Sequence, residues 1–383
     1  MEIEESVEQL KRFIRKLVSC RIKDRKGWHR WRREKGNAEF MAKCFNYRQQ
    51  PGMPSITALV QPFFHPSLPL IGLNYTQTAH LTLHRFHDGW TAPMRLCRGM
   101  VFSRRAALVA FPFPKFFNFG EQEETKHLPN EPFVATVKQD GHLGIIFWYR
   151  GQLIATTRGC FVSASSMIAN QMLKALQERW SKVLPKQVTV LAEIIHPDTE
   201  VHVDYKGWSG FILIGAFDRR TFHDYDYEEL SRLSDKLGIR VTERWLGNSI
   251  EELKALMKDL TVKNQEGFVA RFQSGLRVKF KFASYVALMI GEKLTFRYAM
   301  LHLIEGDFVR KLADMPGEVQ LEAQELADKL FAVKGVRGDK KSRWQYLYEL
   351  VPAEERTDYH RSVCRSFHAW LTRTGQIPAE KTA

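Results

Sequence analysis

The chain of 383 residues lacks a cysteine pattern that would suit a metal site or a disulfide framework. Its five cysteines are scattered and odd in number, and no two of them form a Cys-x-x-Cys pair. Structural zinc sites and small disulfide scaffolds depend on such regular spacing. We therefore expect free thiols and a reducing cytoplasm.

Long apolar runs and glycine-rich phosphate motifs are also missing. No stretch approaches the roughly 18 consecutive apolar residues of a membrane helix, and the acidic start MEIEESVEQLKRF is unlike a secretory signal. Neither the P-loop motif nor G-x-G-x-x-G occurs. The sequence thus predicts a cytoplasmic protein with no membrane partner and without either of these nucleotide-binding loops.

Positive charge is in excess, with 57 Lys and Arg against 43 Asp and Glu and a net charge of +14. Such a surplus favours a polyanionic partner. The segment RIKDRKGWHRWRREK (21–35) interleaves cations with Trp28 and Trp31, and VKGVRGDKKSRW (333–344) is a second basic stretch. Two interpretations stay open for residues 21–35: cations on phosphates with indoles stacked on bases, or a solvated helix face whose tryptophans cover the core.

Hydrophobic periodicity changes along the chain. Alternating or buried-strand patterns recur at 100–119, 143–157, 188–195, 210–217 and 268–282, and HLTLHRFH (80–87) also alternates. Helical spacing marks the first 18 residues, the segment from Ile168 to Trp180, where Ser163 or Ser165 begins a helix, and everything beyond about 295. We predict an α+β domain over 1–295, with a basic helical extension at 1–60, and a small all-α domain over 296–383.

A single lysine stands at the end of an apolar run in FVATVKQDGHLGIIF (133–147). Lys138 could be an edge residue that reaches water, or an amine held near a pocket as a reagent. Other groups suited to a nucleoside triphosphate follow in one order at strand ends. They lie in the stretches CRGMVF (97–102), FPKFFN (113–118), KQDG (138–141), TTRG (156–159), AEIIHPDTEVHVDY (192–205), EGFVA (266–270) and VKFKFASY (278–285).

This ordered set resembles the covalent nucleotidyltransferases, and most closely the phage RNA ligase 1 family of ATP-dependent single-stranded RNA ligases. The resemblance implies a nucleotidyltransferase fold with ATP-grasp-like antiparallel sheets and flanking helices. It also implies a monomer, located in the host cytoplasm if phage-encoded.

The same resemblance implies a three-step reaction. Lys138 attacks the α-phosphorus of ATP, releases pyrophosphate and keeps AMP on its amine. AMP then passes to the 5′-phosphate of an RNA strand, and a 3′-hydroxyl displaces it to close the phosphodiester. The cofactors would be ATP and Mg²⁺, with Mn²⁺ as a substitute. The partners would be single-stranded RNA ends, with tRNA and single-stranded DNA left open. The helical segment 296–383 would be an RNA-specificity module, as such tails are in the family.

Residue roles carry over position by position. The catalytic set would be Lys138, Glu266, Lys279 and Lys281. Glu266 would orient a metal-bound water or Lys138, and the two lysines of VKFK share one strand face, where they can bind the α-phosphate and disfavour a proton on Lys138. The ATP-binding set would be Arg98, Lys115, Arg158, Glu193 and Tyr285, with Glu193 on the ribose hydroxyls.

Asp140 and Gly141 are expected to shape the turn, through an Asx side chain and a glycine at positive φ. His142 departs from the serine that the family pattern has at this position.

Two other functions remain open. A GTP-dependent mRNA capping guanylyltransferase uses the same lysine chemistry, but it needs a β-barrel of the OB type after VKFKF, where this sequence has helical patterns. A catalytically inactive basic RNA-binding scaffold would not need Lys138, Glu193, Glu266, Lys279 and Lys281 together.

Overall fold

A computed structural model describes residues 2–34, 36–83, 86, 88–199, 201–247, 249–259, 261–312, 317–353 and 356–378. The chain divides into two compact units. The first comprises Met1–Gly247 and Glu266–Phe280, and the second comprises Asn248–Gln265 and Lys281–Ala383. No helix among the described residues combines the length and the apolar character needed to cross a bilayer.

The strands are β1 (Val60–Phe64), β2 (Leu70–Tyr75), β3 (Arg98–Ser103), β4 (Leu108–Ala110), β5 (Phe117–Asn118), β6 (Phe133–Lys138), β7 (His142–Tyr149), β8 (Gln152–Thr156), β9 (Val188–Ile195), β10 (Gly210–Asp218), β11 (Arg240–Val241), β12 (Gly267–Phe272) and β13 (Arg277–Lys281). Most of them coincide with the predicted runs, and β9 matches the predicted strand 188–195 residue for residue.

The helices of the first unit are α1 (Glu2–Ser19), α2 (Arg25–Trp31), α3 (Asn37–Cys44), α4 (Ile56–Leu59), α5 (Gln77–Thr82), α6 (Ala92–Leu96), α7 (Glu123–Lys126), α8 (Ala164–Val183) and α9 (Tyr227–Leu237). The second unit contains α10 (Ile250–Met257), α11 (Ala283–Lys293), α12 (Phe296–Glu305), α13 (Phe308–Leu312), α14 (Gly317–Phe331), the 3-10 turn Ala332–Gly335, α15 (Lys340–Glu349) and α16 (Asp358–Arg373).

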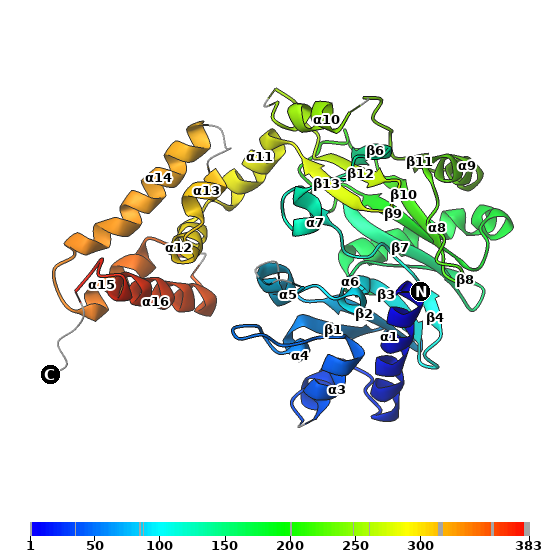
Figure 1. Ribbon diagram of the computed structural model, residues 1–383, viewed down its shortest axis with the longest axis horizontal. Helices are drawn as coiled ribbons and strands as arrows, with labels where there is room; N and C mark the ends of the chain where they lie inside the picture. The colour runs from blue at the N-terminus through cyan, green and yellow to red at the C-terminus, as the bar shows by residue number, and fades with distance from the viewer. Residues whose placement is uncertain are drawn as a thin grey trace. The chain divides into compact units, whose positions relative to one another are not determined.

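Three sheets organise the first unit (Figure 1). Their strand orders are β1-β2-β3-β4, β11-β10-β9-β7-β8 and β5-β13-β12-β6. Antiparallel pairing dominates, for example β7 with β9 and β12 with β6, while β10–β11 and β5–β13 are parallel. The predicted α+β class with antiparallel sheets is confirmed.

The five-stranded sheet has apolar residues on both faces, because successive side chains of a strand point in opposite directions. Along β7, Ile145 and Phe147 join the core formed with the first sheet and the N-terminal helices, whereas Ile146 and Trp148 join the core beneath α8 and α9. Helix α8 begins as predicted, since the Ser163 hydroxyl accepts a hydrogen bond from the Ser166 amide at 3.2 Å. The sheet is therefore a rigid layer between two cores.

The structure decides between the two interpretations of residues 21–35, and it overturns the strand predicted at residues 80–82. Trp28 and Trp31 are 1% and 2% exposed and stack on one another beside Phe13, so the interpretation in which the tryptophans cover the core is the one observed. Residues 80–82 belong to helix α5, because the Thr76 hydroxyl caps it by accepting from the Ala79 amide. Lys35 and residues 84, 85 and 87 of the same patterns lie outside the described residues.

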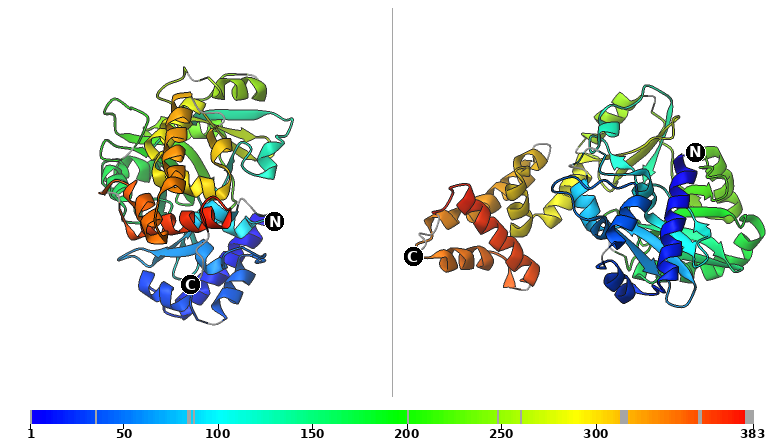
Figure 2. Two further views of the ribbon diagram at one scale, coloured as in Figure 1. Left: turned by 90° about the vertical axis from the view of Figure 1, so that its left-hand side faces the viewer. Right: turned by 60° about the horizontal axis from the view of Figure 1, so that its bottom comes forward.

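The elements that lie wholly within the described part of the second unit are helices (Figure 2). Its core joins residues of α12 to α16, with Leu330, Leu347 and Phe367 fully buried. The Ser284 hydroxyl donates to the Val262 carbonyl at 2.7 Å, which ties segment 248–265 to α11. The division of function between residues 1–295 and 296–383 stays a prediction.

Candidate active site

Lys138 ends strand β6 opposite Gly267 of β12. Because the two strands are antiparallel neighbours, the residue before Gly267 lies beside the lysine. The Lys138 ammonium donates to Oε2 of Glu266 at 2.5 Å, and the two side chains are 22% and 4% exposed. The structure thus holds the amine against a buried carboxylate and leaves it partly open to the outside.

The turn after Lys138 is fixed by Asp140. Its carboxylate accepts hydrogen bonds from the backbone amides of His202 and Val203 at 2.7 and 3.0 Å. The Tyr205 hydroxyl accepts from the Asp140 amide and donates to the Gln139 side chain. Asp140 therefore fastens the loop 201–205 to the end of the strand that carries Lys138.

Gly141 is needed for close packing and not for a left-handed backbone. Positive φ was expected, but Gly141 does not adopt it. A Cβ on this residue would lie 2.7 Å from the Ile194 carbonyl oxygen, 2.6 Å from Ile195 Cδ1 and 2.9 Å from Glu193 Cγ. Only glycine lets this turn approach β9 so closely.

Glu193 lies in the middle of the five-stranded sheet, paired with Leu143 of β7 and Ile212 of β10. Burial raises the pKa of its carboxyl to about 7, and the charges of Glu266 and Asp140 act in the same direction. Lys138 and Arg98 oppose this rise. Glu193 is therefore a buried carboxyl that changes charge near neutral pH, a property that is common at functional sites.

Three cations gather around Tyr75 at the end of β2, and a fourth, Lys279, interacts with two of them. Arg158 donates to the Tyr75 hydroxyl at 2.8 Å, and the Lys115 ammonium lies 5.3 Å from the ring centre. Burial alone would raise the pKa of Tyr75, but Arg158, Arg98 and Lys115 together lower it. The pKa of the fourth cation, Lys279, is well below its usual value because of burial first, and then because of Arg98, Lys115 and Lys138.

Within this group, Arg98 has a donor that is available for a further hydrogen bond. Its Nη1 atom is buried and has no hydrogen-bond partner among the residues that the structure describes. Its guanidinium lies 5.4 Å from the ring centre of Phe116, and the Lys279 ammonium lies 4.7 Å from the same ring. A buried donor without a partner is costly, so an anionic ligand such as a phosphate suits this position.

A cavity of about 470 Å³ joins these groups, and Arg98, Lys138, Glu193 and Lys279 line it. The remaining wall is mostly apolar and includes Phe113, Phe116, Leu143, Ile214 and Val269. A pocket of this size with an apolar wall and a few convergent polar groups is typical of a nucleotide-sized ligand.

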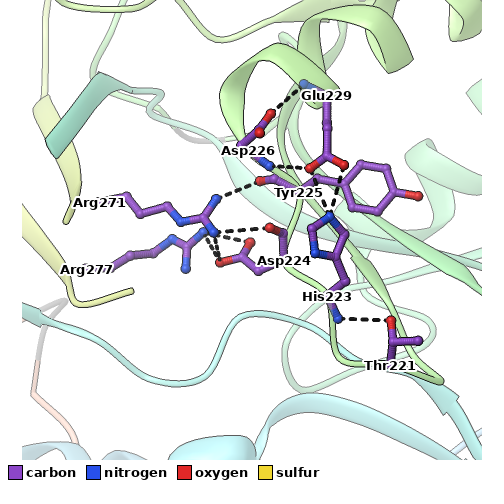
Figure 3. A network of polar contacts seen from close by, with 8 residues as sticks. All are labelled: Thr221, His223, Asp224, Tyr225, Asp226, Glu229, Arg271 and Arg277. Carbon is purple, nitrogen blue, oxygen red and sulfur yellow. Dashed lines mark hydrogen bonds and ion pairs between the residues drawn. The ribbon is translucent and has the colours of Figure 1, made fainter. Parts of the chain in front are cut away.

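Part of the cavity wall was not predicted from the sequence. Arg271, Arg277 and Tyr225 belong to this part, and Asp224 faces both arginines (Figure 3). The Asp224 carboxylate contacts Arg277 at 2.7 Å and Arg271 at 3.2 Å, and Arg271 also donates to the Tyr225 carbonyl at 2.8 Å. Arg277 shares a strand face with Lys279, and this spacing of two is the one sequence signal that could have indicated it.

A family model described as RNA ligase, of the phage RNA ligase 1 type, matches residues 96–285. Residues 96–285, the RNA ligase segment, are therefore similar to this family. This segment contains Lys138, Glu193, Glu266, Lys279 and most of the cavity wall, so the family match and the cavity coincide.

A curated relative also has the name of an RNA ligase. A curated protein of Thermovibrio ammonificans, named "Putative RNA ligase", is 29% identical over 183 residues, which is 46% of this chain and 47% of that protein. The chain thus matches about half the length of this relative.

Among solved structures, an archaeal ATP-dependent RNA ligase (form 1) is 15% identical, with a TM-score of 0.50 over 82% of this chain and 92% of the other. At this identity, the likeness concerns the fold alone.

Not every predicted residue of the RNA ligase segment reaches the cavity. The Lys115 ammonium is enclosed by Tyr75, Trp90 and Phe117, with the nearest ring centre at 4.5 Å. Arg158 is exposed and reaches the site through Tyr75. Lys281 and Tyr285 belong to the second unit, where the Lys281 ammonium lies 5.4 Å from the centre of the Tyr285 ring. Their roles with ATP stay predictions.

A metal site was predicted at Glu266. Among the described residues, three potential ligand atoms come within 4.8 Å of one another at His302, Glu305 and Asp307, in the second unit. That group contains no residue of the RNA ligase segment. The carboxylates that line the cavity are those of Glu193, Asp226 and Glu228, and the charge of Glu193 interacts with that of Glu266.

Proposed function

We propose that this chain is an ATP-dependent RNA ligase that joins 5′-phosphate and 3′-hydroxyl ends of single-stranded RNA through a lysyl-AMP at Lys138. The observation that carries the proposal is the position of Lys138. Its amine is held by Glu266 at the wall of a nucleotide-sized cavity, beside a cationic group that suits phosphates. The family of residues 96–285 supports RNA as the substrate class.

The first step transfers AMP to the lysine. The Lys138 nitrogen attacks the α-phosphorus, a P–N bond forms, and the bond to pyrophosphate breaks. Glu266 orients the amine through the contact at 2.5 Å and accepts the proton that it must lose. Arg98, through Nη1, and Lys279 stabilise the charge that develops on the phosphates, which is the largest contribution that fixed groups make to such reactions.

The base and ribose of ATP occupy the apolar part of the cavity in this proposal. Glu193 accepts hydrogen bonds from ribose hydroxyls, and its ionised form does so best. The second step then forms a 5′–5′ pyrophosphate between AMP and the RNA end and frees Lys138. In the third, a 3′-hydroxyl attacks that 5′-phosphate and releases AMP.

A divalent cation is part of the proposal. Glu266 is a buried residue and Glu193 a half-buried one, and the charge of Glu266 contributes to the raised pKa of Glu193, so a cation at this position would relieve their repulsion. Hard oxygen donors suit Mg²⁺, which keeps several waters. We assign the metal to Glu266 through water. When bound, it would offset phosphate charge and polarise the α-phosphorus.

Every described element after β13 is a helix, which speaks against the β-barrel that the capping alternative needs. The decisive test incubates the protein with ATP or GTP labelled at the α-phosphate, denatures it and measures label on the chain. We expect label from ATP, none from GTP, and none with Lys138→Ala. Lys126→Ala, an exposed lysine on α7, is the matched control and should label normally.

Label from GTP would favour the capping enzyme, and no label from either nucleotide would favour the inactive scaffold. Joining itself is tested by adding single-stranded RNA with a labelled 5′-phosphate to the adenylylated protein. Circles or longer strands are the expected products.

A further inference from the structure

The second unit contains a cavity of its own, about 810 Å³ in volume, between the start of α15 and the last turns of α16. Its lining is strongly basic and includes one indole. The residues that matter here are Lys340, Lys341, Arg343, Trp344, Arg365 and Arg373. On α16, the arginines at 365 and 373 lie on one face, since residues eight apart are separated by little more than two turns.

The positive charge of this cavity is not neutralised from within. Asp339 is the one acidic residue that lines it, and its carboxylate caps α15 by accepting from the Ser342 amide and hydroxyl, both at 2.9 Å. No acidic residue occupies the first turn of α15. Among the described residues, none of the five cations forms an ion pair within 4.0 Å. The positive end of the helix dipole adds to the same potential.

Two hydrogen-bond donors at this cavity have no partner within the part of the chain that the structure describes. Nε of Arg343 and Nε1 of Trp344 are buried, and neither finds an acceptor among the residues that the structure describes. The Trp344 ring is held in place by Tyr348, with ring centres 5.0 Å apart and planes 13° apart. Arg356 and Arg361 lie over the Tyr348 ring in turn. The indole is therefore a fixed aromatic group at the wall of a cationic cavity.

We propose that this cavity binds a short segment of the RNA strand, with Lys341, Arg343 and Arg365 on phosphates and one base against Trp344. The inference rests on the proposed function, because RNA is the substrate there. Guanidinium groups match phosphate geometry, and bases stack on aromatic rings without regard to sequence. A recessed indole in a concave site does not suit a membrane surface, where aromatic side chains must project into the lipid.

The test measures binding of a fluorescein-labelled single-stranded RNA 12-mer with a 5′-hydroxyl, by anisotropy, to the full chain. A 5′-hydroxyl prevents joining, so binding alone is observed. The cavity variant combines Lys341→Gln and Arg365→Gln. The control variant combines Lys329→Gln and Arg310→Gln, which removes the same charges from exposed positions on α14 and α13. Thermal melting checks that each variant is folded.

We expect the cavity variant to bind RNA about tenfold or more weakly, and the control to stay within about twofold of the wild type. The slope of log Kd against log salt should fall by about 1.4 for the cavity variant, since each phosphate contact to a single strand contributes roughly 0.7. Trp344→Phe should bind almost as well as the wild type and Trp344→Leu about tenfold more weakly, because only phenylalanine preserves stacking.

Equal losses of RNA affinity in the cavity and control variants would overturn the proposal, because the loss would then depend on the total charge of the chain and not on this cavity. Displacement of the RNA by AMP at equal concentration would also overturn it in favour of a mononucleotide site. Lysyl-AMP formation, which needs no RNA, is measured on the same variants and should not change. If the wild type forms no lysyl-AMP and the cavity variant still loses RNA, the proposed function fails and the cavity assignment stands.

Discussion

Substituting Glu193 by glutamine should make the first unit more stable at neutral pH. The carboxyl is buried within the sheet and its pKa is raised from 4.5 to about 7, first by burial and then by the charges of Glu266 and Asp140. Since one pKa unit corresponds to about 1.4 kcal/mol, ionising this group in the folded chain costs ~3 kcal/mol. Glutamine keeps the shape and cannot ionise.

The direction in which the free energy of unfolding changes with pH follows from proton binding. Between pH 4.5 and 7 the folded chain binds the Glu193 proton more tightly than the unfolded chain does. The contribution of Glu193 to the free energy of unfolding is therefore complete below pH 4.5 and disappears as pH rises to about 7. The advantage of Glu193→Gln over the wild type should grow by ~3 kcal/mol from pH 4.5 to 8.

Denaturant unfolding of both proteins at pH 5, 6, 7 and 8 measures this difference. Glu178→Gln, an exposed residue of α8, is the control and should show no such trend. A constant gap between Glu193→Gln and the wild type across this range would mean that Glu193 ionises as it does in water, and the electrostatic description of the cavity would be wrong.

Three further substitutions test separate parts of the site. Arg98→Lys keeps the charge but loses the guanidinium donors, so kcat/KM for lysyl-AMP formation should fall roughly ten- to hundredfold, as for a charge-assisted hydrogen bond; an unchanged value would place Arg98 outside the reaction. Gly141→Ala should lower the free energy of unfolding by ~1–3 kcal/mol, because its Cβ meets the Ile194 carbonyl; urea denaturation checks this, and an unchanged midpoint would contradict the packing argument. Lys281→Ala should slow lysyl-AMP formation without lowering the melting temperature, and a large drop in that temperature would make Lys281 a structural residue.

Much of the fold could be predicted because the strands have recognisable local sequence patterns. β9 is a run of apolar residues bounded by turn signals, and β12 and β13 alternate on either side of a Gln-Ser-Gly turn. Residues 80–82 were predicted as strand because HLTLHRFH (80–87) alternates, whereas the structure places them in helix α5, which is capped by Thr76. A short segment carries too few residues for its period to decide between helix and strand.

The site was predictable in part for a different reason. Lys138, Glu193 and Lys279 lie on regular strands and Glu266 directly precedes one, so an ordered set of motifs places them together once the family resemblance is recognised. The burial of Lys115 among Tyr75, Trp90 and Phe117 depends on which distant rings surround it. Likewise, Asp224 meets two arginines some fifty residues away, and no local pattern encodes such a contact.

The way the chain passes between its two compact units has a practical consequence for dissecting the protein. It crosses from one unit to the other three times, near residues 247, 265 and 280. A stop codon after β13 would remove α11 to α16 but keep residues 248–265. This segment would lose the helices with which it clusters, although Leu253 and Met257 on it are buried. A clean separation of the catalytic unit therefore requires an internal excision with a short linker joining 247 to 266, together with the C-terminal truncation.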